Sequence, residues 1–383
     1  MSPTLIDREL PTPEAADLIG LTRDLVTGEL LPRADAYEKE SRFPREVFTT
    51  LGRAGLLSLP YSEEFGGGGQ PATVYLQVVE ELARGWVAVA MGVSVHVLAC
   101  QGLAGFGNAE QQASWLPDQL GGETLGAYCL SEPHAGSDPG SMRTKAVRDG
   151  DDYVINGEKA WITHGPVADF YLLAARTGGE GPKGISMLLV PGGADGVITG
   201  APEKKMGVRS SVTSTVAFQN ARVPADRLLG REGDGFKIAM TALDSGRLGI
   251  AACAVGLAQA ALDAGTAYAA QRTAFGDRIA DFQGVSFLLA DAAAQIEAAR
   301  QLYLYAARRK DAGKNFSAQA AMAKLIATDT AMKVTTDMVQ VLGGAGYVED
   351  HPVERYMREA KLLQIVEGTN QIQRVVIGRT LTR

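Results

Sequence analysis

Cysteine and histidine are scarce in this chain. Only three cysteines and four histidines occur among 383 residues. Cys100, Cys129 and Cys253 are far apart and odd in number, which favours buried free thiols over a disulfide framework or a redox pair. The histidines show neither His-x-x-x-His spacing nor clustering with cysteine, so the sequence predicts no metal site.

Positive charge is also in short supply. Lysine and arginine total 37 against 44 aspartates and glutamates, which gives a formal net charge of −7. A surface that neutralises phosphates needs the opposite sign. We therefore expect no nucleic-acid partner.

The chain lacks long hydrophobic runs. Its most apolar stretch, residues 86–98, is interrupted by Gly92, Ser94 and His96 and is shorter than the ~20 residues of a membrane helix. It is predicted to be a buried core helix, with no membrane insertion. The N-terminal sequence MSPTLIDREL has acidic residues and no apolar core, so we expect no targeting signal and a cytoplasmic, bacterial location.

Several catalytic motifs are missing as well. There is no GxGxxG after a predicted strand, no GxxxxGK[ST] and no GxSxG elbow. These absences argue against a Rossmann domain, a P-loop and a serine hydrolase.

The periodicity that is present changes twice along the chain. Apolar residues recur at helical spacing over 18–119 and again after 235, whereas short β-rich runs occupy 125–229. The expected fold is α+β multidomain: a helical N-terminal domain (1–122), a mostly antiparallel β middle domain (123–232) and a C-terminal four-helix bundle (233–383). Its helices are expected over 236–272, 283–306, 317–342 and 352–380. Asn156-Gly157 predicts a hairpin turn.

Two segments of the middle region have side chains suited to a planar ligand. In YCLSEPHAGSD (128–138) a strand runs into a turn rich in hydroxyls, although an ordinary connection would look similar. Trp161 and Thr163 lie two apart and would share one side of a strand, forming a wall for a ring. Packing of the tryptophan in the core is the alternative.

Two segments of the C-terminal region have charged residues at positions where a ligand could bind. Arg272 and Gln283 flank a predicted helix junction, where a phosphate and a base or ribose could bind; a solvated charge at a helix end is equally compatible. Glu367 lies among apolar residues and precedes Gly368, which permits close approach of a ligand. Burial would raise its pKa and suit it to accept a proton, unless it is an exposed helix-end residue.

Taken together, these segments resemble the flavin-dependent acyl-CoA dehydrogenases over nearly the whole chain. The motifs that carry the resemblance are YCLSEPHAGSD (128–138), WITHG (161–165), DSGR (244–247), RTAFG (272–276), QVLGGAG (340–346) and IVEGTNQIQ (365–373). The resemblance implies the same three-part fold, assembled as a homotetramer with one FAD per subunit.

The resemblance also implies a reaction. The family converts an acyl-CoA thioester to the trans-2-enoyl-CoA and passes the electrons to an electron-transfer flavoprotein. By position, Glu367 would be the base that removes the α-proton while the β-hydride goes to flavin N5. Donors fixed at the thioester oxygen, the Glu367 N–H and a ribityl hydroxyl, would stabilise the enolate.

Further roles carry over by matching position. Residues matching the flavin-ring and ribityl positions are Tyr128, Leu130, Ser131, Trp161, Thr163, Thr369 and Gln371, with Ser137 between the flavin and the CoA phosphate. Those matching the pyrophosphate and adenine positions, partly across a subunit interface, are Arg272, Phe275, Gln283, Gln340, Gly343 and Gly344. Asp244 and Arg247 match CoA contacts, and Gly368 flanks the thioester.

The chain departs from the family pattern at several positions. Val366 replaces a common tyrosine, which favours short or short branched acyl chains of fatty-acid or branched-chain amino-acid catabolism. Gly246 occupies the position from which some relatives supply the base, so Glu367 is the one candidate. His134 replaces a common glycine, and residues 86–107 contain no arginine for a second substrate carboxylate. Two alternatives stay open: an acyl group on a carrier protein, or a non-catalytic scaffold binding FAD or CoA.

Overall fold

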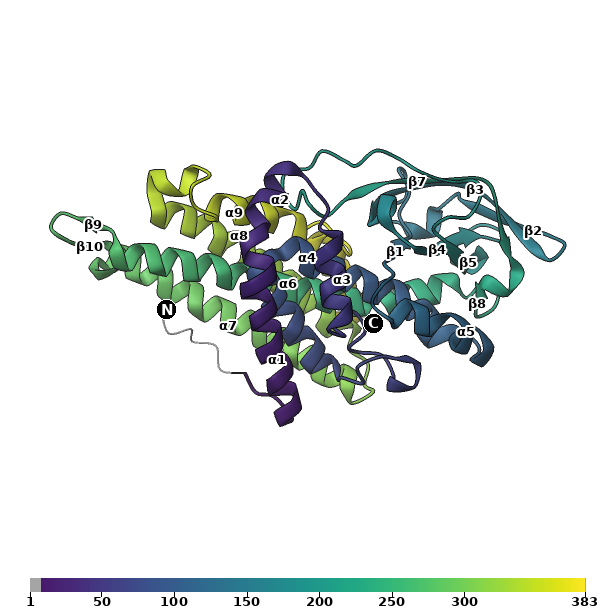
Figure 1. The fold of residues 1–383 in the computed structure, drawn as a ribbon, viewed down its shortest axis with the longest axis horizontal. Coiled ribbons are helices and arrows are strands. Elements are labelled where there is room, and N and C mark those ends of the chain that lie inside the picture. Colours follow the sequence, from purple (N-terminus) through teal and green to yellow (C-terminus); the bar gives the residue numbers. More distant parts are fainter. Residues whose placement is uncertain (1–7, 383) are drawn as a thin grey trace.

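A large β-sheet lies at one end of the long axis of the computed structural model, which describes residues 8–382, and most of the remainder is helical (Figure 1). The chain order is helices, then strands, then helices, which confirms the predicted fold class. Part of the N-terminal sequence in which no targeting signal is expected, residues 1–7, lies outside the described residues.

The N-terminal helices are separated by prolines and glycines. Their bounds are α1 Pro13–Leu25, α2 Leu31–Glu40, α3 Arg45–Arg53, α4 Ala72–Phe106 and α5 Ala109–Leu120, with a π-helical segment at Val26–Leu30. The backbone of Trp86 leaves the helical region at φ −161° and ψ 101°, so α4 is kinked there. The segment after this kink is buried, as predicted for residues 86–98.

The middle region is one eight-stranded sheet. Its strands are β1 Gly126–Cys129, β2 Lys145–Asp149, β3 Asp152–Thr163, β4 Phe170–Arg176, β5 Ile185–Pro191, β6 Val197–Thr199, β7 Thr213–Pro224 and β8 Leu228–Leu229. The order is β6-β7-β3-β2-β4-β5-β8, and β1 pairs with β4. Only the β1–β4 and β2–β4 pairs are parallel, so the sheet is mostly antiparallel as predicted.

The hairpin predicted at Asn156-Gly157 is wrong. Both residues lie inside β3 and pair with β7, next to a register shift after Ile155. Gly157 has φ 148°, and a Cβ there would lie 2.5 Å from Thr144 Oγ1, so a glycine is required by a close approach rather than by a turn. The chain reverses instead at Gly150, with φ 63°, between β2 and β3.

The C-terminal region contains three long helices and two shorter ones. They are α6 Gly235–Gln271, α7 Gln283–Asp311, α8 Ser317–Leu342, α9 Val353–Leu363 and α10 Asn370–Leu381. The single helix predicted over 352–380 is wrong, because the chain breaks between α9 and α10. Glu367 and Gly368 have φ 53° and 86°, which no α-helix accommodates. The α6–α7 connection forms a small hairpin, β9 Thr273–Ala274 with β10 Asp277–Arg278.

The predicted domain limits, after Gly122 and after Glu232, fall in the connections between α5 and β1 and between β8 and α6. They stay predictions. The three cysteines are free and buried, as expected. Helices α4 and α6 are long and apolar enough to cross a membrane, but 83% and 89% of their most apolar windows are buried inside the protein, as in core helices.

Two buried histidines attach the helices to the sheet. The N–H of Gly126 donates to His96 Nδ1 at 3.0 Å, and His164 Nδ1 donates to the Gly126 carbonyl at 3.1 Å. Rings of Phe43 and Phe48 pack edge-on against His164. Burial lowers the pKa of His96 to about 3 and that of His164 to about 4, so both are neutral.

These histidines predict an acid-sensitive fold. Their pKa values are lower in the folded chain than the ~6.5 of an unfolded chain, so the unfolded state binds more protons below pH 6.5. Stability should fall as pH drops from 6.5 towards 4, by up to about 1.4 kcal/mol per pH unit for each histidine. Urea unfolding from pH 7 to 5 measures this, and His164→Asn should have a weaker pH dependence than the parent. Equal pH dependence would contradict the role of His164.

Candidate active site

Glu367 lies in the turn between α9 and α10. Two buried side chains, Gln373 and Lys324, hold this turn by hydrogen bonds to its backbone. Gln373 Nε2 donates to the carbonyls of Glu367 and Gly368 at 3.2 and 2.8 Å. Lys324 Nζ on α8 donates to the same Gly368 carbonyl at 3.0 Å and to Asn370 Oδ1 at 2.9 Å. These bonds hold the left-handed backbone that aims the Glu367 side chain inward.

The Glu367 carboxyl group is poorly solvated. Its Oε2 is buried and has no hydrogen-bond partner within the described residues. Burial raises the pKa of Glu367 to about 7, although Arg247 and Lys324 act in the opposite direction. This carboxyl group can therefore take up a proton near neutral pH. The alternative of an exposed helix-end glutamate is excluded.

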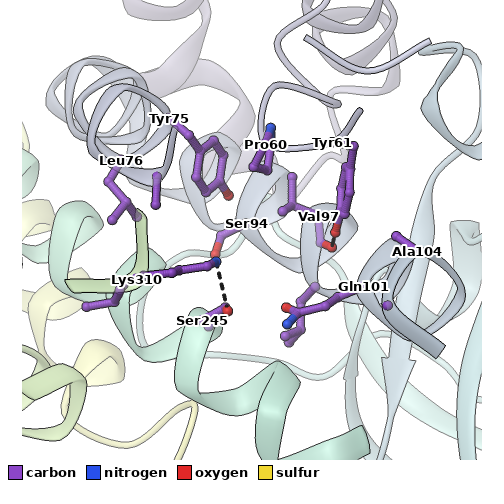
Figure 2. A pocket seen from close by; sticks show the side chains of 15 residues that line it. Pro60, Tyr61, Tyr75, Leu76, Ser94, Val97, Gln101, Ala104, Ser245 and Lys310 are labelled. Atoms are coloured by element: carbon purple, nitrogen blue, oxygen red, sulfur yellow. Dashed lines mark hydrogen bonds between the residues drawn. The ribbon is translucent and has the colours of Figure 1, made fainter. Parts of the chain in front are cut away.

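Gly246 of α6 leaves room for this carboxyl group. A Cβ at Gly246 would lie 2.8 Å from Glu367 Oε2, closer than normal packing allows. The same glycine lines a cavity of about 210 Å³ between α4 and α6. Figure 2 shows the polar side chains around that cavity, including Ser94 and Gln101 of α4 and Lys310 of α7. The remaining lining is mostly apolar, so the space suits a short apolar chain, and the proton acceptor lies next to Gly246 in its wall.

Asp244 and Arg247 lie one turn apart on α6, and Arg247 is close enough to Glu367 to lower its pKa. Arg247 forms an ion pair with Asp244, whose Oδ1 also accepts from Ser317 Oγ at 2.9 Å. Burial raises the pKa of Asp244 despite Arg247. Arg247 is 6% exposed, and its Nε has no partner among the described residues. This buried N–H is therefore a hydrogen-bond donor that the described residues leave unused.

The candidate flavin residues of the sheet come from β1, the turn after it and the end of β3, and the N–H of Ala160 in β3 donates to the Ser131 carbonyl at 2.9 Å. Tyr128 at the end of β1 donates to the Ala239 carbonyl of α6 at 3.4 Å, and burial together with the Glu367 carboxylate raises its pKa. Trp161 is 65% exposed and has φ 61°, so it is not a core tryptophan. Leu130 is buried, Ser131 and Thr163 are half-buried, and Ser137 is exposed.

The turn after β1 is anchored by a buried ion pair that sequence reasoning missed. Lys159 Nζ of β3 donates to Glu132 Oε1 at 2.9 Å and to the Leu130 carbonyl at 3.0 Å. Glu132 also accepts the N–H groups of Arg143 and Thr144 at 2.7 and 2.9 Å. Burial opposes ionisation, but Lys159 and these N–H donors lower the pKa of Glu132 to about 2.

The candidate pyrophosphate and adenine residues lie elsewhere. Arg272, Gly343 and Gly344 line a separate cavity of about 450 Å³ at the β9–β10 end, and Phe275 in that hairpin is 97% exposed. Gln283 begins α7, and Gln340 lies in the last turn of α8. Figure 1 places the β9–β10 hairpin at the opposite end of the molecule from the sheet.

The separation follows from the length of α6. Ala239 beside Tyr128 and Arg272 after the helix end are 33 positions apart, which is about 50 Å at ~1.5 Å per residue. One dinucleotide cannot contact both sets in the same chain. By contrast, Thr369 caps α10 through the Ile372 N–H, and exposed Gln371 follows it, so both stay near Glu367.

Sequence reasoning also missed Lys324 and Gln373, which support the Glu367 turn. Lys324 is fully buried on a helix face that otherwise carries small apolar residues such as Ala320, Ala327 and Ala331. A lysine within a stripe of small apolar residues is the sequence feature that could have identified Lys324 as a buried, functional side chain. The sequence around Gln373 has no comparable feature.

Three family models match in chain order. They describe the acyl-CoA dehydrogenase N-terminal domain over residues 12–123, the middle domain over 127–221 and the C-terminal domain over 233–382. Together they cover almost the whole chain.

Individual relatives agree with these models. An acyl-CoA dehydrogenase of Bacillus subtilis is 43% identical, covering 97% of this chain and 98% of its own. The short-chain specific acyl-CoA dehydrogenase of Clostridium acetobutylicum is 41% identical, covering 95% and 96%.

Solved structures give the same picture. The butyryl-CoA dehydrogenase of Megasphaera elsdenii has a TM-score of 0.96 at 41% identity, covering 99% of this chain and 100% of its own. A chain from work on the electron transferring flavoprotein of Acidaminococcus fermentans matches equally well, with the same identity, TM-score and coverage. The chain thus belongs to the acyl-CoA dehydrogenase family, whose members are FAD-dependent oxidoreductases.

Proposed function

We propose that this enzyme dehydrogenates short-chain acyl-CoA thioesters between Cα and Cβ, with Glu367 as the base. The observation that carries the proposal is the unpartnered, buried carboxyl oxygen of Glu367 beside the cavity at Gly246. The short-chain and butyryl-CoA enzymes among the relatives support the acyl length.

The residues at the sheet fit a flavin ring. Trp161 presents a large, exposed aromatic surface next to half-buried hydroxyls of Ser131 and Thr163, which suits a planar ring with polar edges. FAD, when bound there, would supply the two-electron oxidant for the substrate β-carbon. Tyr128 is close enough to Glu367 for the carboxylate to raise the pKa of its phenol. A flavin ring bound beside Tyr128 would therefore lie near the base.

The protein's own part in the reaction is to position the thioester and remove one proton. The α-C–H bond breaks as its proton moves to Glu367 Oε2, and the new Cα–Cβ double bond forms as the hydride leaves. Donors at the thioester oxygen stabilise the negative charge that develops there. Asp244 and Arg247 are proposed to bind the pantetheine side of CoA, with Ser137 at its phosphate and Gly368 beside the thioester.

A second copy of the chain is proposed to complete the FAD site. Arg272 lies about 50 Å along α6 from Ala239, which contacts Tyr128. The residues proposed to hold the pyrophosphate and adenine of a neighbouring subunit's FAD are therefore Arg272 with Phe275, Gln283, Gln340, Gly343 and Gly344. We expect a tetramer with one FAD per chain by light scattering and absorbance. A monomer with full FAD content would contradict this arrangement.

The pKa of Glu367 predicts the pH dependence of turnover. The base must be ionised to accept a proton, and its pKa is about 7, so kcat/KM should rise with pH through a single-proton limb near pH 7. A profile flat from pH 5.5 to 9 would contradict Glu367 as the base. The profile is measured with butyryl-CoA and an artificial electron acceptor.

Product analysis tests the substrate class. We expect butyryl-CoA to lose two hydrogens and yield the trans-2-enoyl-CoA by mass spectrometry, with slower turnover of isobutyryl-CoA and long chains. Turnover only of the butyryl group on a carrier protein would favour the carrier alternative.

An electron-transfer flavoprotein is the proposed electron acceptor, supported by the origin of one similar chain.

A further inference from the structure

Lys324 of α8 is a buried lysine beside the proposed base. Burial lowers the pKa of its ammonium group to about 7, although Glu367 and Asp329 act in the opposite direction. Its side chain is fully buried, and its ammonium group lies among atoms of the Glu367–Asn370 turn. Burying a lysine costs several kcal/mol unless its charge is compensated. This ammonium group donates to the Gly368 carbonyl and to Asn370 Oδ1, and both acceptors belong to that turn. Lys324 therefore stabilises the turn.

The surrounding charges are few and can be named. Arg247 on α6 is close enough to the Glu367 carboxyl group to lower its pKa, and Tyr128 of β1 is close enough for Glu367 to raise the pKa of its phenol. Asp329, one turn along α8 from Lys324, accepts from Asn370 Nδ2 at 2.7 Å and so acts on the same turn. Glu367 therefore has two basic side chains near it, of which Lys324 is also hydrogen-bonded to its backbone turn.

We propose that Lys324 is a positioning residue for this base, whose ammonium group orders the Glu367–Gly368 turn and places a positive charge behind the carboxylate. The inference rests on Glu367 as the base. Loss of the charge should make Glu367 harder to ionise, and loss of the hydrogen bonds should let the carboxylate drift from the α-carbon. The first effect is reversed by raising the pH, whereas the second is not.

The structure allows the two effects to be separated. Gln373 Nε2 also donates to the Gly368 carbonyl, at 2.8 Å, so the turn keeps one anchor when Lys324 is changed. Lys324→Gln removes the charge but keeps an amide donor, and Lys324→Met removes both. Lys333→Met, on the same helix but exposed, is the matched control.

The experiment is a pH profile of kcat and KM for butyryl-CoA with each FAD-loaded variant. We expect the limb near pH 7 to move to higher pH in both Lys324 variants and to stay in place in Lys333→Met. At pH 7, kcat should fall by about tenfold or more with little change in KM. Lys324→Gln should recover at pH 9, and Lys324→Met only in part.

An unshifted limb in both Lys324 variants would overturn the inference, as would a loss confined to KM. Failure of the proposed function is distinguishable, because the unmodified enzyme would then show no turnover or no limb. Melting temperatures and FAD content of each variant are measured alongside. If Lys324→Met does not fold, the shift in Lys324→Gln decides the question.

Discussion

Glu367→Gln should lower kcat/KM for butyryl-CoA by about 10²- to 10⁴-fold while the protein keeps its FAD. A carboxamide has nearly the size of the carboxyl group but cannot accept the α-proton. The kinetics and the flavin absorbance are compared at pH 8, where Glu367 of the parent is ionised. Full activity of this variant would remove Glu367 from the reaction.

The same substitution should stabilise the fold. The pKa of Glu367 is raised from about 4.5 to about 7, so the native state binds more protons than the unfolded state between these values. Stability contributed by this group therefore falls as pH rises through that range. At pH 8 Glu367→Gln should be more stable by about 1–3 kcal/mol, and at pH 4 the gain should vanish. A gain that is equal at both pH values would contradict the burial of this charge.

Lys159→Met should cost about 3–5 kcal/mol of unfolding free energy and most of the bound FAD. The substitution leaves Glu132, which is 2% exposed, as a buried carboxylate without its lysine partner. It also releases the Leu130 carbonyl, in the turn proposed to contact the flavin. Urea unfolding and FAD content measure both effects.

A double variant shows whether the loss of stability comes from the uncompensated Glu132 carboxylate or from the substitution of Lys159 in general. Lys159→Met with Glu132→Gln removes both charges and should recover much of the lost stability. Lys145→Met, on exposed β2, is the matched control and should change stability by less than about 0.5 kcal/mol. If the double variant is no more stable than Lys159→Met, the uncompensated carboxylate is not the cause.

Local periodicity was sufficient to predict the fold class, because helices and strands leave different apolar spacings in the chain. Local sequence patterns gave a wrong prediction where the same residue pair occurs in two kinds of structure. Asn156-Gly157 suits a hairpin turn, but in β3 the glycine serves the close approach of Thr144. Local periodicity also failed at the α9–α10 break, where the flanking apolar residues continue the helical pattern through Glu367.

The site was predictable only in part. Motifs located Glu367, Tyr128 and Trp161, because each lies in a segment whose composition is unusual by itself. Lys159 and Lys324 bind groups 27 and 44 residues away, and a single sequence does not show which distant groups a buried lysine meets. Gln373 binds carbonyls only five and six residues away, but a glutamine in a polar turn is too common to indicate that role. The separation of the two proposed FAD half-sites likewise depends on the direction of α6, which composition does not encode.

The most direct test of the account is an anaerobic titration of the purified protein with butyryl-CoA. We predict that the visible absorbance of the bound flavin bleaches with one equivalent of thioester per FAD, and that trans-2-enoyl-CoA appears in equal amount. A yellow protein left unchanged by excess butyryl-CoA would contradict the proposed dehydrogenation of a CoA thioester.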